Sequence, residues 1–286
     1  MKELHTIEGV RSWLRPLRQA GRRIGFVPTM GALHEGHLSL IRAARAETQV
    51  VVVSIFVNPT QFGPHEDLDR YPRTLQADLE ACRREGVDGV FVPSTAEMYR
   101  PDASTEVTET RLAAGLCGVH RPGHFKGVTT VVAKLFNIVQ PDVACFGQKD
   151  AQQAAVIRRM VRDLDFPVEV LVCPTVREPD GLAMSSRNRL LSAEDRRRAV
   201  CLPQALRWAV GQVERGERRV ESLVAGARER IAAAGPCEID YVEIVDAEDL
   251  RPVATVSGRC LLAAAVRIGG VRLIDNMPLD AVCRPQ

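Results

Sequence analysis

The chain has few lysines, few aromatic residues, no long apolar run and little net charge. Of its 286 residues 38 are basic, yet only Lys2, Lys126, Lys134 and Lys149 are lysines, and aromatic residues make up 5%. A formal charge of +2 argues against a nucleic-acid partner or a membrane surface. No stretch reaches about 18 uninterrupted apolar residues and the start carries no apolar leader, so we expect a cytoplasmic protein without a membrane partner.

The eight cysteines form no CxxC pair and no cluster with histidine. A disulfide framework or a structural zinc site requires such spacing, so the pattern indicates reduced thiols in a reducing compartment. A chain of this length also buries enough surface to fold without disulfides or metal.

The first part of the sequence alternates short apolar runs with amphipathic segments. Runs that begin at residues 22, 49 and 87 are almost continuously apolar, as expected for strands buried on both faces, and further strands are expected from residues 142 and 168. Helical spacing covers residues 38–46, 72–85, 128–138 and 151–163, and "TEVTET" from residue 105 predicts an edge strand. This alternation predicts an α/β fold: a Rossmann-like, doubly wound parallel sheet covered on both sides.

After about residue 177 the pattern changes. Long Arg- and Glu-rich helical patterns cover residues 193–214 and 220–233, and strand-like runs joined by short turns begin at residues 239, 258 and 271. We therefore expect a Rossmann-like domain over residues 1–177 and a smaller C-terminal α+β domain over residues 178–286. The second domain would begin with a mobile "MSSRN" loop.

One predicted strand-to-helix junction, "PTMGALHEGHLSL", carries two histidines, His34 and His37. In an open parallel sheet, ligands bind beyond the carboxyl ends of the strands, where helix N-termini present N–H groups. Gly31 and Gly36 allow the backbone to approach a ligand closely. Two imidazoles at this point can donate hydrogen bonds to phosphate oxygens and stabilise charge that develops on phosphorus.

Three other interpretations compete with phosphate binding. The histidines of "HEGH" are spaced by three rather than by the four of HExxH, and no third ligand is evident, which argues against zinc. The GxGxxG fingerprint is absent after this strand, which argues against a dinucleotide cofactor. The remaining alternative is that the two histidines only cap and pack the start of a helix.

The HxGH pattern resembles the signature of the HIGH-type nucleotidyltransferase superfamily, whose members bind ATP and attack its α-phosphate. "GLAMSSRNRL" from residue 181 resembles the second, mobile-loop signature of that superfamily. Further stretches narrow the match: "FVPTMGALHEGH", "VVSIFVNPTQF", "DLDRYPRTLQADL", "RPGHFKGV", "CFGQKDAQQ", "REPDGLAMSSRN" and, near the end, "VRLIDN". From about residue 24 to 190 they closely resemble the pantothenate synthetase (pantoate–β-alanine ligase) family.

The resemblance implies an ATP-dependent condensation of (R)-pantoate with β-alanine. The pantoate carboxylate attacks the α-phosphorus of ATP and releases pyrophosphate, and β-alanine then displaces AMP from the pantoyl adenylate to give pantothenate. The implied substrates are ATP, pantoate and β-alanine, the implied cofactor is Mg²⁺, and the implied assembly is a homodimer. The first step chiefly requires positioning and stabilisation of phosphate charge, which explains a site rich in donors.

The resemblance also implies catalytic residues. His37 matches the residue usually assigned as proton donor, although a purely electrostatic histidine would give the same sequence, and His34 would contact the phosphates beside it. Lys149 suits a point-charge contact with phosphate, and the loop around Arg187 suits closure over a triphosphate. The implied catalytic set is His34, His37, Lys149, Ser185, Ser186 and Arg187. The implied ATP-binding set is Met30, Gly31, Ala32, Leu33, His34, Glu35, Gly36, His37, Gly147, Gln148, Lys149, Asp150, Val176, Met184, Ser185, Ser186 and Arg187.

Four polar residues are candidates for binding the acid substrate: Asn58, Gln61, His124 and Gln153. Amide side chains both donate and accept, so they suit a small hydroxy acid that carries a carboxylate. In the family, the residues that match Gln61 and Gln153 bind pantoate, and Gln61 also borders the β-alanine site.

Three carboxylates are candidate Mg²⁺ ligands: Asp67, Asp69 and Asp150. The acidic stretch around the first two is equally consistent with a solvated loop. The sequence does not identify which aspartate binds the metal.

Two rival functions remain. Another nucleotidyltransferase that stops at a nucleotidyl product, such as a pantetheine-phosphate adenylyltransferase, would not explain "FVNPTQF" or the second domain. A non-catalytic nucleotide-binding regulator would not need HxGH, Lys149 and the Ser-Arg loop together.

Overall fold

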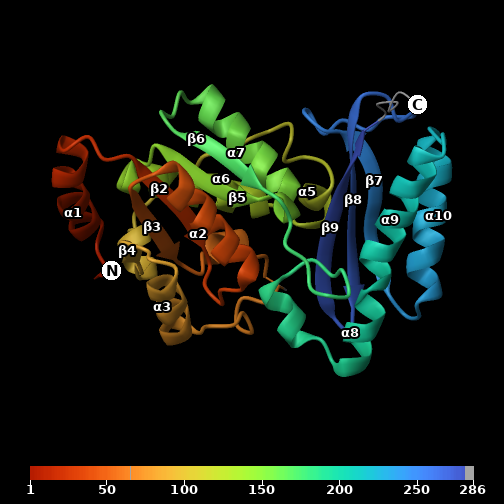
Figure 1. The fold of residues 1–286 in the computed structure, drawn as a ribbon, viewed down its shortest axis with the longest axis horizontal. Helices are drawn as coiled ribbons and strands as arrows, with labels where there is room; N and C mark the ends of the chain where they lie inside the picture. Colours follow the sequence, from red (N-terminus) through yellow and green to blue (C-terminus); the bar gives the residue numbers. More distant parts are fainter. Residues whose placement is uncertain (65, 281–286) are drawn as a thin grey trace. The chain divides into compact units, whose positions relative to one another are not determined.

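The computed structural model describes residues 1–64 and 66–280, and its first feature is a six-stranded parallel sheet (Figure 1). The strand order is β1-β4-β3-β2-β5-β6. Their bounds are β1 Lys2–Leu4, β2 Ile24–Thr29, β3 Val50–Ile55, β4 Gly89–Phe91, β5 Val143–Gly147 and β6 Glu169–Cys173. From β2 the chain winds outward to β4 and returns to β5 on the other side of β2. The doubly wound prediction is confirmed, and the topological switch point lies between β2 and β5.

Alternate strand residues face two different helix layers. Phe26, Val52 and Phe146 pack with helices α1 (Ile7–Gln19), α6 (His124–Val139) and the later part of α7 (Ala151–Asp163). Val27 and Val53 pack on the opposite face with α2 (Glu35–Glu47) and α3 (Leu75–Arg84). Both faces are covered, which explains why the strands are continuously apolar rather than alternating.

A second sheet contains three antiparallel strands in the order β7-β8-β9, with bounds β7 Glu238–Asp246, β8 Arg259–Ile268 and β9 Val271–Asp280. It packs against α9 (Cys201–Glu214) and α10 (Val220–Ala233), which lie along it in Figure 1. Leu206 and Leu223 from these helices are fully buried with Leu262 of β8. This smaller α+β part was predicted.

Contacts divide the chain into two units. The first contains Met1–Thr110, Arg121–Gln148 and Val156–Val176; the second contains Arg111–His120, Lys149–Ala155 and the chain from Arg177 onward. Two short segments that precede residue 177 therefore belong with the second sheet. The single boundary between residues 177 and 178 stays a prediction. In the part of the chain that the structure describes, no helix is both long and apolar enough to span a membrane.

Three expectations about individual elements were wrong. "TEVTET" forms no strand; side chains tie it to α6 instead, since Thr130 Oγ1 accepts from the Val107 N–H at 3.0 Å and Thr129 Oγ1 donates to the Val107 carbonyl at 2.6 Å. The helix expected over residues 193–214 divides into α8 (Ala193–Ala199) and α9. Pro203 has no N–H to continue the helical bonding from α8. Short turns were expected between the last three strands, but the connection between β7 and β8 is long; only β8 and β9 are joined by a short turn, formed by Gly269 and Gly270.

The N-terminal elements were missed. β1 and α1 follow one another at the start, and α1 is capped by Thr6, whose side chain accepts from the Gly9 N–H. Val10 and Leu14 form its fully buried stripe. A capping threonine before an apolar stripe is a helix signal that was present in the sequence.

Candidate functional site

The backbone conformation of the turn that follows β2 is fixed by hydrogen bonds to a buried carboxylate. Gly31 and Ala32 both have left-handed backbone angles, with φ of 81° and 50°. The N–H groups of Ala32 and Leu33 donate to the two oxygens of Asp78 at 2.9 and 2.8 Å, and the Gly31 N–H donates to Thr29 Oγ1 at 3.1 Å. Asp78 comes from α3 and is only 3% exposed. The turn therefore has the shape that this carboxylate and the Gly31 backbone impose on it.

Asp78 was missed by the sequence analysis, although a signal existed. It lies on the inward stripe of α3 with Leu75, Leu79 and Cys82, a position where an apolar residue is expected. A carboxylate is placed there only when donors meet it. Burial raises the pKa of the Cys82 thiol to about 12, and the charge of Asp78 adds to that rise.

The two histidines cap α2 reciprocally. His34 is the N-cap, and its Nδ1 accepts from the Gly36 N–H at 3.2 Å, while His37 Nδ1 accepts from the His34 N–H at 3.3 Å. Their rings lie 4.1 Å apart between centroids. Because each Nδ1 accepts a backbone hydrogen bond, the ring proton belongs on Nε2. Both imidazoles are therefore set up as hydrogen-bond donors at a helix N-terminus.

Asn58 lies behind Gln61 and orients it. Asn58 is 1% exposed, and its Nδ2 donates to Gln61 Oε1 at 3.2 Å and to the Gly127 carbonyl at 3.1 Å. Its Oδ1 accepts from the Tyr99 hydroxyl at 2.9 Å and from the Thr60 hydroxyl at 3.0 Å. Every hydrogen-bonding group of the Asn58 amide is thus used within the protein. Burial raises the pKa of its partner Tyr99, which therefore keeps the proton that it donates. Asn58 therefore orients the side chain of Gln61.

Gln61 lies at the end of a short 3-10 helix, η1 (Pro59–Gln61), that follows β3. Its Nε2 donates to the sulfur of Met30 at 2.9 Å, which brings it to the turn after β2. β2 and β3 are neighbours in the sheet, so their carboxyl ends meet at one edge. The structure therefore brings Gln61 together with the histidine-bearing turn, as the prediction of a common site requires.

His124 holds the backbone of Gln61. His124 Nδ1 lies 2.8 Å from the Gln61 carbonyl, and its Nε2 lies 2.9 Å from an Arg121 nitrogen. A carbonyl only accepts and a guanidinium only donates, so the ring carries its proton on Nδ1. Arg121 also pairs bidentately with Glu66, at 2.6 and 2.5 Å. Burial is the largest single effect and raises the pKa of Glu66, but the opposing effects together, chiefly the hydrogen bond and the charge of Arg121, lower that pKa below its usual value.

Three predicted residues of the second unit follow β5 in the chain. Lys149 belongs to the short 3-10 helix η2 (Gln148–Asp150), and its side chain is 20% exposed. Its Nζ lies 3.6 Å from the Asp150 carboxylate, whose side chain is 44% exposed. Gln153 is half-buried in the first turn of α7. A partly buried lysine beside one accessible carboxylate is an arrangement that can meet a phosphate and its metal ion.

The predicted Ser-Arg loop carries a 3-10 helix, η3 (Ser186–Leu190). Ser185 is its N-cap, and its hydroxyl accepts from the Arg187 N–H at 3.3 Å. Ser186 is 6% exposed, whereas Met184 and Arg187 are half-buried. In this conformation the hydroxyl of Ser185 caps its own helix.

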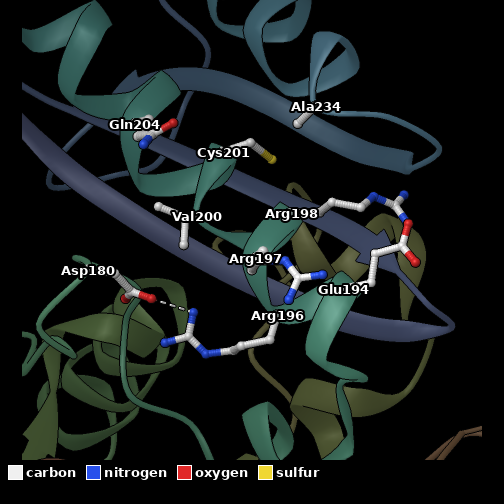
Figure 2. A pocket seen from close by; sticks show the side chains of 9 residues that line it. All are labelled: Asp180, Glu194, Arg196, Arg197, Arg198, Val200, Cys201, Gln204 and Ala234. Carbon is white, nitrogen blue, oxygen red and sulfur yellow. Dashed lines mark ion pairs between the residues drawn. The ribbon is translucent and has the colours of Figure 1, made fainter.

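A charged cluster that the sequence analysis missed anchors this loop. Glu178 accepts from Asn188 at 2.7 Å and from Arg196 at 2.5 Å, so it joins both sides of the loop to α8. Arg196 also pairs with Asp180 at 2.6 Å, as Figure 2 shows, and that hydrogen bond lowers the pKa of Asp180. None of the predicted site residues lines the pocket drawn there.

Over residues 1–64 and 66–280, no three His, Cys, Asp or Glu side chains gather as a complete metal site would. Mg²⁺ is commonly held by one or two carboxylates together with substrate phosphates. Asp150 fits that mode. Asp67 is half-buried and Asp69 is exposed, both on the loop between η1 and α3.

A doubly wound parallel sheet with a histidine-capped helix beside its switch point has the architecture of a nucleotide-binding α/β enzyme. A family model described as pantoate-β-alanine ligase matches residues 2–278. A curated protein of Moorella thermoacetica, named pantothenate synthetase, is 55% identical over 280 residues, which is 98% of this chain and 99% of that protein.

Solved structures agree. The crystal structure of pantothenate synthetase from Thermus thermophilus is 46% identical, with a TM-score of 0.92 over 97% of this chain and 99% of that chain. A pantoate-β-alanine ligase from Francisella tularensis, complexed with β-γ ATP and β-alanine, is 37% identical with a TM-score of 0.81 over 97% of both chains. The chain belongs to the pantoate–β-alanine ligase family.

Substitution of Asp78 by Asn should destabilise the first unit strongly. An asparagine keeps the shape but replaces one acceptor by an NH₂ group that faces a backbone N–H, so one buried donor loses its partner. We expect a loss of about 2–4 kcal/mol in the free energy of unfolding, measured by urea denaturation. Asp163→Asn, which alters an exposed pair with Arg162, is the matched control and should change stability by less than about 0.5 kcal/mol. Equal losses in the two variants would contradict the role given to Asp78.

Proposed function

We propose that this chain condenses (R)-pantoate with β-alanine at the expense of ATP and releases pantothenate, AMP and pyrophosphate. The observation that carries the proposal is the reciprocal histidine cap beside the switch point, in a chain that matches its family model over residues 2–278. The similarity to the Francisella tularensis structure with β-γ ATP and β-alanine supports the two substrates. Pantoate attack on the α-phosphorus, through a pantoyl adenylate, is the order of steps that we infer.

His34 and His37 would act through their Nε2–H groups on the phosphate oxygens. Protonation at Nδ1 would break the backbone hydrogen bonds that the two rings accept. Donation from a fixed neutral ring therefore agrees with the geometry better than release of a proton from Nδ1. Pre-organised donors of this kind contribute about 10²–10³ in rate when aimed at developing charge. A carboxylate is already nucleophilic at neutral pH, so adenylation needs no general base.

In the second unit, Lys149 and the loop of Ser185, Ser186 and Arg187 would contact the triphosphate. Lysine supplies a point charge, and the loop supplies hydroxyl and guanidinium donors. The loop would close over the triphosphate and open again when pyrophosphate is released. Asp150 would hold Mg²⁺ together with substrate phosphates, and that ion would neutralise phosphate charge when bound. The remaining predicted ATP-binding residues keep the roles implied by the family resemblance.

Gln61 and Gln153 would bind pantoate. The contacts of Gln61 support separate roles for the residue that binds the substrate and for the residues that orient it. Its Oε1 is occupied by Asn58 and its carbonyl by His124, so these two residues orient the amide from behind. We therefore propose Asn58 and His124 as positioning residues rather than direct ligands. The proton on Nδ1 of His124 already serves the carbonyl of Gln61.

We also propose a cytoplasmic homodimer, as the family resemblance and the cysteine pattern imply. Sedimentation equilibrium measures the assembly directly. A monomer at all accessible concentrations would contradict the dimer without affecting the proposed chemistry.

The decisive experiment follows all products. The purified chain is incubated with ATP, Mg²⁺, D-pantoate and β-alanine, and AMP, pyrophosphate and pantothenate are quantified. We expect equal amounts of the three, and pyrophosphate release that depends on pantoate. A chain that forms no AMP under these conditions would refute the ligase function. AMP without amide would indicate a different acceptor amine.

Substitution of Gly127 by Ala should disturb pantoate binding selectively. A Cβ at this position would lie 2.3 Å from the Thr60 carbonyl oxygen and 2.7 Å from the Gln61 nitrogen, and both are backbone atoms. Overpacking of this kind costs about 1–3 kcal/mol, and moving η1 moves Gln61. We expect the KM for pantoate to rise by a larger factor than the KM for ATP. Gly211→Ala, in α9 with nothing within 4 Å of the new Cβ, is the control and should leave both constants unchanged.

A further inference from the structure

The "VRLIDN" stretch forms part of β9 and carries two adjacent buried polar residues. Asp275 is 2% exposed and Asn276 is 5% exposed. Buried polar groups are costly unless they are hydrogen-bonded, so their partners indicate their purpose. Neither residue has a role in the function proposed above, and their partners lie in two different elements of the second unit.

Asp275 supports the segment that leads into the Ser-Arg loop. Arg177 donates to its two oxygens at 2.7 and 2.9 Å, and the carboxylate is fully buried. The same guanidinium donates to the Gly181 carbonyl at 3.0 Å, and the backbone of Arg177 bridges to Ala183. Met184 follows directly. The start of the loop is therefore held by a bidentate ion pair to β9.

Asn276 supports Lys149. Its Nδ2 donates to the Lys149 backbone carbonyl at 2.9 Å, and its own N–H donates to Asp275 Oδ1 at 2.8 Å. A carbonyl bonded in this way restrains the backbone from which the lysine side chain extends. Asn276 thus restrains the residue that we propose as the phosphate-binding ammonium.

We propose that Asp275 and Asn276 are positioning residues that set the separation between Lys149 and the Ser-Arg loop. Successive residues of a strand point in opposite directions, so two neighbours on β9 can reach two elements that are far apart in sequence. Both elements are needed to meet one triphosphate, and a misplacement of about 1 Å costs about 10²-fold in rate. This inference rests on the proposed function, because it assigns both elements to the same substrate.

A double-mutant cycle tests the role of Asn276. Asn276→Ala, Lys149→Ala and the double variant are compared by kcat/KM for ATP, from pantoate-dependent pyrophosphate release. We expect Asn276→Ala alone to lower kcat/KM by about 10–100-fold. In the Lys149→Ala background it should lower the value by no more than about 3-fold, because a residue that acts through Lys149 has nothing left to position.

A matched pair tests Asp275 and separates positioning from stability. Asp240 of β7 is another buried carboxylate of the same sheet, paired with Arg267 at 3.2 Å and Arg272 at 2.6 Å. Asp275→Asn and Asp240→Asn should both lower the Tm, but only Asp275→Asn should raise the KM for ATP. If Asn276→Ala does not fold, Asn276→Ser replaces it in the cycle.

The outcomes are distinct. Effects of Asn276→Ala and Lys149→Ala that multiply fully, or an equal change of KM in the two aspartate variants, would overturn the inference while the wild-type chain remains an active ligase. A wild-type chain that releases no pyrophosphate with ATP and pantoate would instead refute the proposed function.

Discussion

The pair of hydrogen bonds from Ala32 and Leu33 to the Asp78 carboxylate is the constraint on which the histidine-bearing turn depends. Two successive residues of that turn have left-handed angles, and only one of them is glycine. Strain of this kind persists when the surroundings impose it. The carboxylate imposes it from α3, and the chain can then enter α2 with His34 at the N-cap. Without this carboxylate the N–H groups of Ala32 and Leu33 would be buried without partners, and the turn would no longer place His34 at the N-cap of α2.

A similar arrangement recurs around the other residues for which we propose ligand contacts: a buried or half-buried polar residue orients the residue that would meet the ligand. Asn58 and His124 hold the amide and the carbonyl of Gln61. In the second unit, Asp275 and Asn276 hold the approaches to the Ser-Arg loop and to Lys149. Reactions whose main requirement is positioning depend on such supports, since sites that are about 1 Å too loose lose most of their rate. Positioning matters especially in this family's reaction, in which a carboxylate must meet a phosphorus atom and an amine must then meet the activated carboxyl carbon.

Much of the fold could be predicted, because parallel strands buried on both faces and amphipathic helices leave strong periodic patterns. Ala151–Asp163 and Val220–Ala233 have the bounds that their spacing predicted. The prediction of an edge strand at residue 105 failed because Thr129 and Thr130 bond the N–H and the carbonyl of Val107 within it, and hydrogen bonds to distant side chains leave no periodic signal. The division at Val200 was signalled locally by Pro203. Motifs pointed to the histidines, Lys149 and Gln61 as candidate site residues, and their roles stay predictions. Asp78, Glu178 and Asp275 were missed because their roles come from partners between 10 and 98 positions away.

The central claim is that the turn presents two imidazoles as Nε2–H donors to phosphate, with each Nδ1 accepting a backbone hydrogen bond. The ring-nitrogen chemical shifts of ¹⁵N-histidine-labelled protein measure this directly, with His34→Gln and His37→Gln variants to assign the signals. The account predicts that at neutral pH both rings carry their proton on Nε2 and have an unprotonated Nδ1. A proton on Nδ1 of His37, whether in the other tautomer or in an imidazolium, would contradict it.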